Sequence, residues 1–153
     1  MREMRIDILS SSDAPDVARM LNRNSKKYQQ YFTPFSFDET TIASMLSSAV
    51  RDKFWGVWKE DDLIAFFMLR GMDEGFETPA YGACVAEAHQ GMGLLKLTLQ
   101  FVLSWCKVYS VPKLMLKVHP ENAVAKQVYE KFGFVQKGID EKNKNLIYYY
   151  VFT

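Results

Sequence analysis

The chain has few cysteines, almost no net charge and no long hydrophobic run, and each of these absences argues against a class of protein. Its 153 residues include two cysteines, Cys84 and Cys106, and neither lies in a CxxC or Cys/His spacing. This pattern argues against a disulfide framework, predicts no metal site and favours a reducing compartment. The formal net charge of +1 removes the electrostatic attraction that draws basic proteins to nucleic acids and anionic membranes.

Hydrophobic runs are short throughout the sequence. No uninterrupted apolar stretch approaches the roughly 20 residues that a membrane helix needs. Residues 1–6 include an acid and lack the apolar core of a signal peptide. We therefore expect a cytoplasmic protein with no membrane partner. Because 48% of the residues are hydrophobic and no repeat or linker interrupts them, residues 1–153 are expected to form one domain.

Helical and strand-like patterns alternate along the chain. Apolar runs between turn signals predict strands at 4–9, 54–59, 63–70, 79–86, 113–118, 134–137 and 146–152. Apolar residues at helical spacing predict helices at 14–24, from 39 to about 50, at 94–108 and at 123–132. Asp13 and Asp38 are expected to cap the first two of these helices. This order predicts a mixed α/β fold with two helices between its first two strands.

Two closely spaced glycines lie between a strand-like run and the longest predicted helix. The segment consists of His89, Gln90, Gly91, Met92, Gly93, Leu94 and Leu95. Such glycines let the backbone turn tightly, so that successive amide N–H groups and the positive end of the helix face one anion. Taken alone, the pattern fits a structural strand-to-helix turn equally well.

A second motif begins about thirty residues later. A short predicted helix starts after Asn122, carries Tyr129 near its end and stops at Gly133. A phenol near neutral pH keeps its proton but can donate it to a nascent thiolate. A turn that suits a diphosphate, followed by such a donor, indicates acyl transfer from coenzyme A.

Together, the element order and the two motifs resemble the GNAT superfamily of N-acetyltransferases. The resemblance covers essentially the whole chain and is strongest over residues 81–134. Gln90, Gly91 and Gly93 match the family signature R/Q-x-x-G-x-G/A, and residues 122–134 match its N-x-x-A…Y-E-x-x-G-F segment without a gap. The pair of motifs at this spacing is far more specific than a glycine pattern alone.

Three positions depart from the family pattern. Leu95 replaces a small residue, Glu87 stands where proline is frequent, and Lys117 stands where some relatives carry a glutamate. The departures at Leu95 and Lys117 leave open a second interpretation, in which the chain is a non-catalytic sensor that binds acyl-CoA. The retained Tyr129 argues against it, since a binding protein needs no proton donor.

The resemblance implies a fold, a cofactor and a set of binding residues. The fold is a mostly antiparallel twisted sheet of six or seven strands, flanked by about four helices, with its fourth and fifth strands splayed apart. The cofactor is acetyl-CoA, and no metal is involved. The implied cofactor-binding residues are Cys84, Val85, Gln90, Gly91, Met92, Gly93, Leu94, Leu95 and Asn122.

Tyr129 matches the position of the family's general acid, which donates a proton to the departing thiolate. The general base is less defined. Glu77 is the first candidate, because it belongs to a carboxylate-rich turn just before the strand that approaches the acceptor. His119, Glu121 and water are the alternatives, and a solvated polar hairpin accounts for the turn nearly as well.

Acceptor binding is predicted from two further segments. Asp73 and Glu74 in the same turn are expected to hold an ammonium group. Tyr31 and Phe32 lie in an aromatic stretch, 28–37, where the family places its acceptor-binding loop, and core packing is the alternative. We expect a small primary amine, with a nucleotide-linked amino sugar first and a protein N-terminus or lysine second. The apolar final strand is also compatible with a homodimer.

Overall fold

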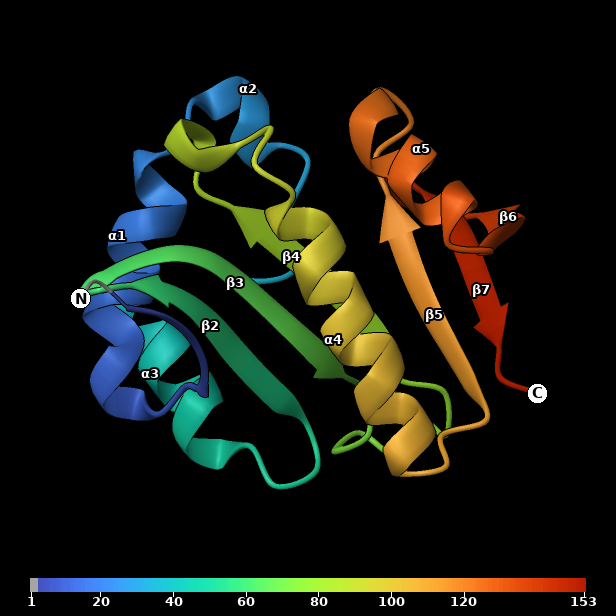
Figure 1. The fold of residues 1–153 in the computed structure, drawn as a ribbon, viewed down its shortest axis with the longest axis horizontal. Coiled ribbons are helices and arrows are strands. Elements are labelled where there is room, and N and C mark those ends of the chain that lie inside the picture. The colour runs from blue at the N-terminus through green and yellow to red at the C-terminus, as the bar shows by residue number, and fades with distance from the viewer. Residues whose placement is uncertain (1–2) are drawn as a thin grey trace.

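The computed structural model describes residues 3–153, and all seven of its strands belong to one sheet (Figure 1). Their order is β1-β2-β3-β4-β5-β7-β6. Neighbouring strands are antiparallel except for β4 and β5, which are parallel. The strands are β1 (Met4–Ile8), β2 (Lys53–Lys59), β3 (Asp62–Arg70), β4 (Ala80–Val85), β5 (Lys113–Val118), β6 (Val135–Ile139) and β7 (Leu146–Val151). The predicted fold class is confirmed.

Five α-helices cover the sheet, with a 3₁₀ turn before α1 and another after β4. They are α1 (Ala14–Arg23), α2 (Lys26–Gln29), α3 (Glu39–Ser48), α4 (Leu94–Val108) and α5 (Ala123–Lys131), with the turns η1 (Ser11–Asp13) and η2 (Glu87–His89). The four-residue α2 was not predicted, because it is too short to show a helical period. Among the described residues, no helix combines the length and apolar character that a membrane span requires.

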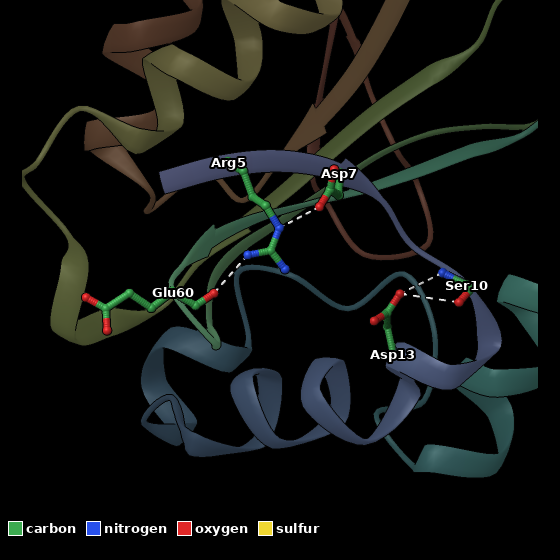
Figure 2. A network of polar contacts seen from close by, with 5 residues as sticks. All are labelled: Arg5, Asp7, Ser10, Asp13 and Glu60. Carbon is green, nitrogen blue, oxygen red and sulfur yellow. Dashed lines mark hydrogen bonds and ion pairs between the residues drawn. The ribbon is translucent and has the colours of Figure 1, made fainter. Parts of the chain in front are cut away.

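Two predicted helix caps behave differently. The Asp38 carboxylate accepts the Thr41 N–H at 2.9 Å and starts α3, as predicted. Asp13 precedes α1 but makes no side-chain cap; its carboxylate instead accepts the N–H of Ser10 at 2.8 Å (Figure 2). The prediction for Asp13 was therefore wrong in its bonding, because the 3₁₀ turn before α1 moves the capping contact three residues upstream.

The edge of the sheet is held by a second group of polar contacts in Figure 2. Arg5 on β1 pairs with Asp7 at 2.6 Å and donates to the carbonyl oxygen of Glu60 at 3.0 Å. The same guanidinium lies over the Trp58 ring, 5.3 Å from its centroid. These contacts join the first strand to the β2–β3 turn. Residues 1 and 2, part of the segment expected not to be a signal peptide, lie outside the described residues.

Both faces of the central strands are buried, since helices pack on each side. On β3, Phe66 and Met68 face a cluster built with α1 and α3, whereas Phe67 and Leu69 face a cluster built with α4 and α5. The sheet therefore separates two hydrophobic cores. A side chain from one face meets one from the other only where the sheet opens.

Such an opening exists between β4 and β5. Their ladder contains two pairs, Ala80 with Met115 and Tyr81 with Leu116, at the beginning of β4. Beyond Tyr81, β4 continues beside β3 as far as Val85 while β5 continues beside β7. Figure 1 shows the two strands diverging, with α2 and α5 on either side of the gap. The predicted splay of the fourth and fifth strands is confirmed.

Candidate active site

The glycine turn lies at the open end of β4 and leads into α4. Gly91 and Gly93 have φ angles of +78° and +83°, and Gly93 is the N-cap of α4. Side chains other than glycine adopt this conformation at a cost, which explains the two glycines. A Cβ at either position would meet nothing within 4 Å, so the turn has open space above it.

The first backbone N–H groups of α4 have no partner within the helix, and they lie at its positive end. This donor set fits a diphosphate. Leu95 is half-buried and packs on the core below, so its bulk is directed away from the turn, and Leu94 is buried beside it. Gln90 and Met92 are exposed along the turn. The turn therefore tolerates the departure at Leu95.

Backbone donors of β4 face the opening. The Ala86 N–H bonds to the Ile64 oxygen of β3 at 2.9 Å. Because successive N–H groups of a strand point to opposite edges, the Val85 N–H points toward β5, where the ladder has ended. The Val85 N–H thus faces the splay.

Cys84 does not have the properties of a nucleophile. Burial raises the pKa of its thiol to about 12, although a hydrogen bond from Asn24 opposes the rise. The Asn24 Nδ2 lies 3.4 Å from the sulfur. A reactive cysteine needs a lowered pKa and access to solvent, and Cys84 has neither.

Tyr129 lies on α5, facing the opening from the α4–α5 side. Its side chain is 6% exposed, and its ring centroid is 6.2 Å from that of Tyr81 and 6.0 Å from that of Phe134. Burial raises the pKa of Tyr129 well above its ordinary value, and the neighbouring Tyr28 phenol raises it further. The hydroxyl therefore keeps its proton at any physiological pH. Asn122 begins α5 by accepting the Ala125 N–H at 3.4 Å.

Tyr28, which was not predicted as a site residue, faces the same opening from the other side. It belongs to α2 and is packed at the margin of the α1–α3 cluster. Burial raises its pKa to about 12 and the nearby Cys84 adds to the rise, whereas hydrogen bonds with the Gln90 side chain and the Val85 backbone lower it. The aromatic stretch pointed to this region without distinguishing this ring from its neighbours.

Tyr31 and His119 form one side of the opening's mouth. Their ring centroids are 5.0 Å apart, and Tyr31 also makes an edge contact with Tyr28 at 6.0 Å. The His119 Nδ1 accepts the Glu121 N–H at 3.1 Å, so neutral His119 carries its proton on Nε2. In this tautomer His119 presents a donor at Nε2, which does not suit a general base.

Phe32 does not line this mouth. It packs against Phe35, Phe37 and Phe66, and its ring covers Gly82 on β4, where an added Cβ would lie 3.3 Å from it. The expected acceptor-binding role of Phe32 does not fit this placement, whereas the core-packing alternative does.

The carboxylate-rich turn lies at the opposite end of β4 from the opening. From Ala80 to Val85 the strand rises about 3.3 Å per residue, or roughly 16 Å in all, and Glu77 precedes Ala80. Glu74 and Glu77 are both exposed. The structure does not bring Glu77 together with Tyr129, so the assignment of Glu77 as general base does not fit this arrangement.

Asp73 is used within the fold. Its carboxylate accepts the N–H groups of Val50, Arg51 and Asp52 at 3.0, 2.7 and 3.2 Å, and these bonds hold its pKa below the ordinary value. In return, the Asp52 carboxylate accepts the Met72 and Asp73 N–H groups. This reciprocal cap joins two turns. Asp73 and Glu74 border a cavity of about 540 Å³ beside α3, away from the splay.

Lys117, the third departure from the family pattern, is paired. Its ammonium lies 2.9 Å from the Asp140 carboxylate in the β6–β7 turn, and this contact lowers the pKa of Asp140. Lys117 thus joins β5 to the neighbouring hairpin turn.

Comparison with known proteins identifies the family. A model of the acetyltransferase (GNAT) family matches residues 17–134, and no curated protein matches the chain in sequence. An alanine acetyltransferase of a ribosomal protein from Vibrio fischeri superimposes with a TM-score of 0.81 at 17% identity, covering 99% of this chain and 94% of that one. PaiA N-acetyltransferase from Thermoplasma acidophilum, in complex with coenzyme A, superimposes with a TM-score of 0.78 at 18% identity, covering 98% of this chain and 99% of that one. A spermidine N-acetyltransferase chimera that includes Vibrio cholerae sequence superimposes with a TM-score of 0.77 at 19% identity, covering 97% of this chain and 95% of that one. Since the family model covers most of the chain, the protein belongs to the GNAT family of acetyltransferases, which use acetyl-CoA.

Proposed function

We propose that the protein transfers the acetyl group of acetyl-CoA directly to a primary amine at the splay between β4 and β5, within a single catalytic domain. One observation supports this proposal above the others. The glycine turn, the splay-facing Val85 N–H and the buried Tyr129 phenol all lie around the same opening of the sheet. An anion cradle, an oxyanion donor and a proton donor are what acyl transfer to an amine requires.

Each group has a role in the proposed reaction. When bound, acetyl-CoA supplies an acetyl thioester whose carbonyl carbon accepts the amine nitrogen. The backbone N–H groups of residues 90–95 hold the diphosphate, and the Val85 N–H faces the developing oxyanion. The C–N bond forms, the C–S bond breaks, and Tyr129 donates its proton to the departing sulfur. The amine nitrogen gives up a proton, through water, which restores the phenol.

The acceptor proposed here is a weakly basic amine. Two carboxylates near the site already have partners: Glu87 accepts from Ser25, and Asp140 pairs with Lys117. Glu121, another candidate base, is exposed. His119 presents an N–H group, as described above. Where no side chain is poised to remove a proton, an amine that is partly neutral at pH 7.5 reacts faster. An α-amino group, with a pKa of about 8, meets this requirement better than a lysine at about 10.4.

A peptide N-terminus and a sugar amine, free or nucleotide-linked, both belong to this class, whereas lysine side chains and linear polyamines do not. The name of the Vibrio fischeri neighbour, which refers to an alanine of a ribosomal protein, is consistent with a peptide N-terminus as the acceptor. Tyr31 at the mouth offers an aromatic surface to either acceptor.

The test is acetyl-CoA-dependent thiol release, with the product identified by mass spectrometry. The acceptors are a peptide with a free N-terminal alanine and no lysine, an N-blocked peptide with one lysine, a hexosamine with its nucleotide-linked form, and spermidine. We expect turnover at pH 7.5 with the free peptide or the sugars. Turnover restricted to the lysine peptide or spermidine would contradict the acceptor class. Coenzyme A binding with no acetylated product in any reaction would favour the acyl-CoA sensor instead.

A homodimer remains a proposal, and the final strand gives it limited support. Tyr148 is 1% exposed within the chain, and the Lys113 ammonium lies 4.1 Å from the Tyr149 ring centroid. Most of the apolar surface of β7 therefore has partners in the same chain. Sedimentation equilibrium across a concentration series measures the oligomeric state directly.

A further inference from the structure

Tyr28 and Tyr129 approach each other from opposite faces of the sheet. Tyr28 packs at the margin of the α1–α3 cluster, whereas Tyr129 belongs to the α4–α5 cluster. The Tyr28 phenol is nevertheless close enough to raise the pKa of Tyr129. Two groups on opposite faces meet only through the gap between β4 and β5, which α2 and α5 flank in Figure 1. The Tyr28 ring also makes an edge contact with Tyr31, which lies beside His119 just after β5, so Tyr28 lies near the ends of both splayed strands.

The surroundings of the Tyr28 hydroxyl define its hydrogen bonding. Hydrogen bonds with the Val85 backbone and the Gln90 side chain lower the pKa of Tyr28, so its hydroxyl lies near the end of β4 and the glycine turn. A phenol oxygen accepts two hydrogen bonds and its own O–H donates one. The Tyr28 O–H therefore lies where it can donate to an atom that faces the Val85 N–H in the opening.

The position of Tyr28 is fixed by a polar latch that joins residues 24–28 to the end of β4. The Asn24 Oδ1 accepts the Glu87 N–H at 2.9 Å, and the Glu87 carboxylate accepts both the N–H and the hydroxyl of Ser25. Ser25 Oγ in turn accepts the Tyr28 N–H at 3.3 Å. Asn24 is 5% exposed, so its bonds are shielded from water. The departure at Glu87 therefore has a use, because this carboxylate holds the helix that carries Tyr28.

We propose that Tyr28 is a second catalytic phenol, which donates a hydrogen bond to the carbonyl oxygen of the acetyl thioester. This inference rests on the proposed function. As the amine nitrogen bonds to the carbonyl carbon, negative charge grows on that oxygen, and the Tyr28 O–H stabilises it. Tyr28 keeps its proton throughout. The proton that leaves the amine nitrogen still goes to the sulfur by way of Tyr129, so the two phenols serve different atoms.

The two roles predict different signatures. A donor to the carbonyl oxygen weakens the C=O bond in the bound thioester before any acceptor is added, so infrared spectroscopy detects it. The experiment compares the carbonyl stretch of acetyl-CoA labelled with ¹³C at the carbonyl, bound to the wild-type protein and to Tyr28→Phe and Tyr129→Phe. Tyr109→Phe, which removes an exposed phenol near the far end of α4, is the matched control.

We expect the bound carbonyl band to lie below its frequency in water in the wild type, and to rise in Tyr28→Phe. Tyr109→Phe should match the wild type. With a working acceptor, Tyr28→Phe should lower kcat by roughly 10²–10³-fold, the usual loss for one oxyanion donor, while coenzyme A affinity and Tm change little.

The outcomes separate the two proposals. A band that is the same in wild type and Tyr28→Phe overturns the role of Tyr28, whatever the turnover. A band that rises in Tyr28→Phe, when no amine is acetylated, supports the hydrogen bond to the thioester and refutes the proposed acetyl transfer. Loss of coenzyme A binding in Tyr28→Phe would also overturn the inference, because it would make Tyr28 a packing residue of the cofactor site.

Discussion

Replacing Gly93 by aspartate tests whether the turn before α4 binds the diphosphate. A Cβ at this position meets no protein atom within 4 Å, so the substitution causes no clash. Its φ of +83° costs a side chain about 1–2 kcal/mol. The aspartate carboxylate and a phosphate, as two unit negative charges about 5 Å apart, would repel each other by about 3 kcal/mol at an effective dielectric constant of 20. Since the turn is exposed, screening reduces this value. We expect coenzyme A to bind Gly93→Asp roughly 10–10²-fold more weakly than the control, Gly93→Asn.

Gly93→Asn is the matched control, because asparagine has nearly the same shape and also tolerates a left-handed backbone. Isothermal titration calorimetry with coenzyme A at low and at high salt measures the charge effect as the ratio of the two Kd values. The ratio should fall as salt screens the charges, while thermal unfolding should be similar for both variants. Equal Kd values for the aspartate and asparagine variants at low salt would show that the diphosphate lies elsewhere.

Three further substitutions test the remaining assignments. Tyr129→Phe should lower kcat by roughly 10²–10⁴-fold without weakening coenzyme A binding, as for a positioned proton donor, and an unchanged single-turnover rate would refute this role. Glu77→Gln should leave kcat and its pH profile unchanged, since Glu77 is exposed at the far end of β4; a loss confined to low pH would restore it as the base. Asp73→Ala should lower Tm but not kcat. The pKa of Asp73 in the folded protein is below its ordinary 3.8, so its stabilisation is complete above pH 3.8 and is lost as pH falls through the lowered value. A Tm difference that persists well below that range would contradict the reciprocal cap.

Local patterns predicted most of the fold. The bounds of α4 and β5 agree with the predicted residues, because both have a strong period and clear turn signals at their ends. The cap at Asp38 and the glycine turn also depend on neighbours a few residues away. Information of this kind is contained in a short stretch of sequence.

Contacts between distant segments were not predictable in the same way. The carboxylates of Asp52 and Asp73 bind each other's turns across about twenty residues, which makes a structural cap resemble a functional acidic cluster in the sequence. Glu77 precedes the strand that lines the site, but sequence proximity to a strand does not say which end of it carries the chemistry. The role of Tyr28 was not predictable from the sequence, because its position depends on hydrogen bonds between residues 24–25 and Glu87.

The three departures from the family pattern, considered together, favour a catalyst over a sensor. Leu95 packs into the core, Lys117 pairs with Asp140, and Glu87 holds Ser25, so none of them fills or disables the opening. Glu87 also has a positive role, because the hydrogen bonds it forms hold the helix that places a second phenol, Tyr28, at the splay. Burying hydroxyl groups costs free energy unless they are hydrogen-bonded, and a protein that only binds a thioester gains nothing from directing two of them at the opening. An enzyme that must stabilise charge on oxygen and deliver a proton to sulfur has a use for both.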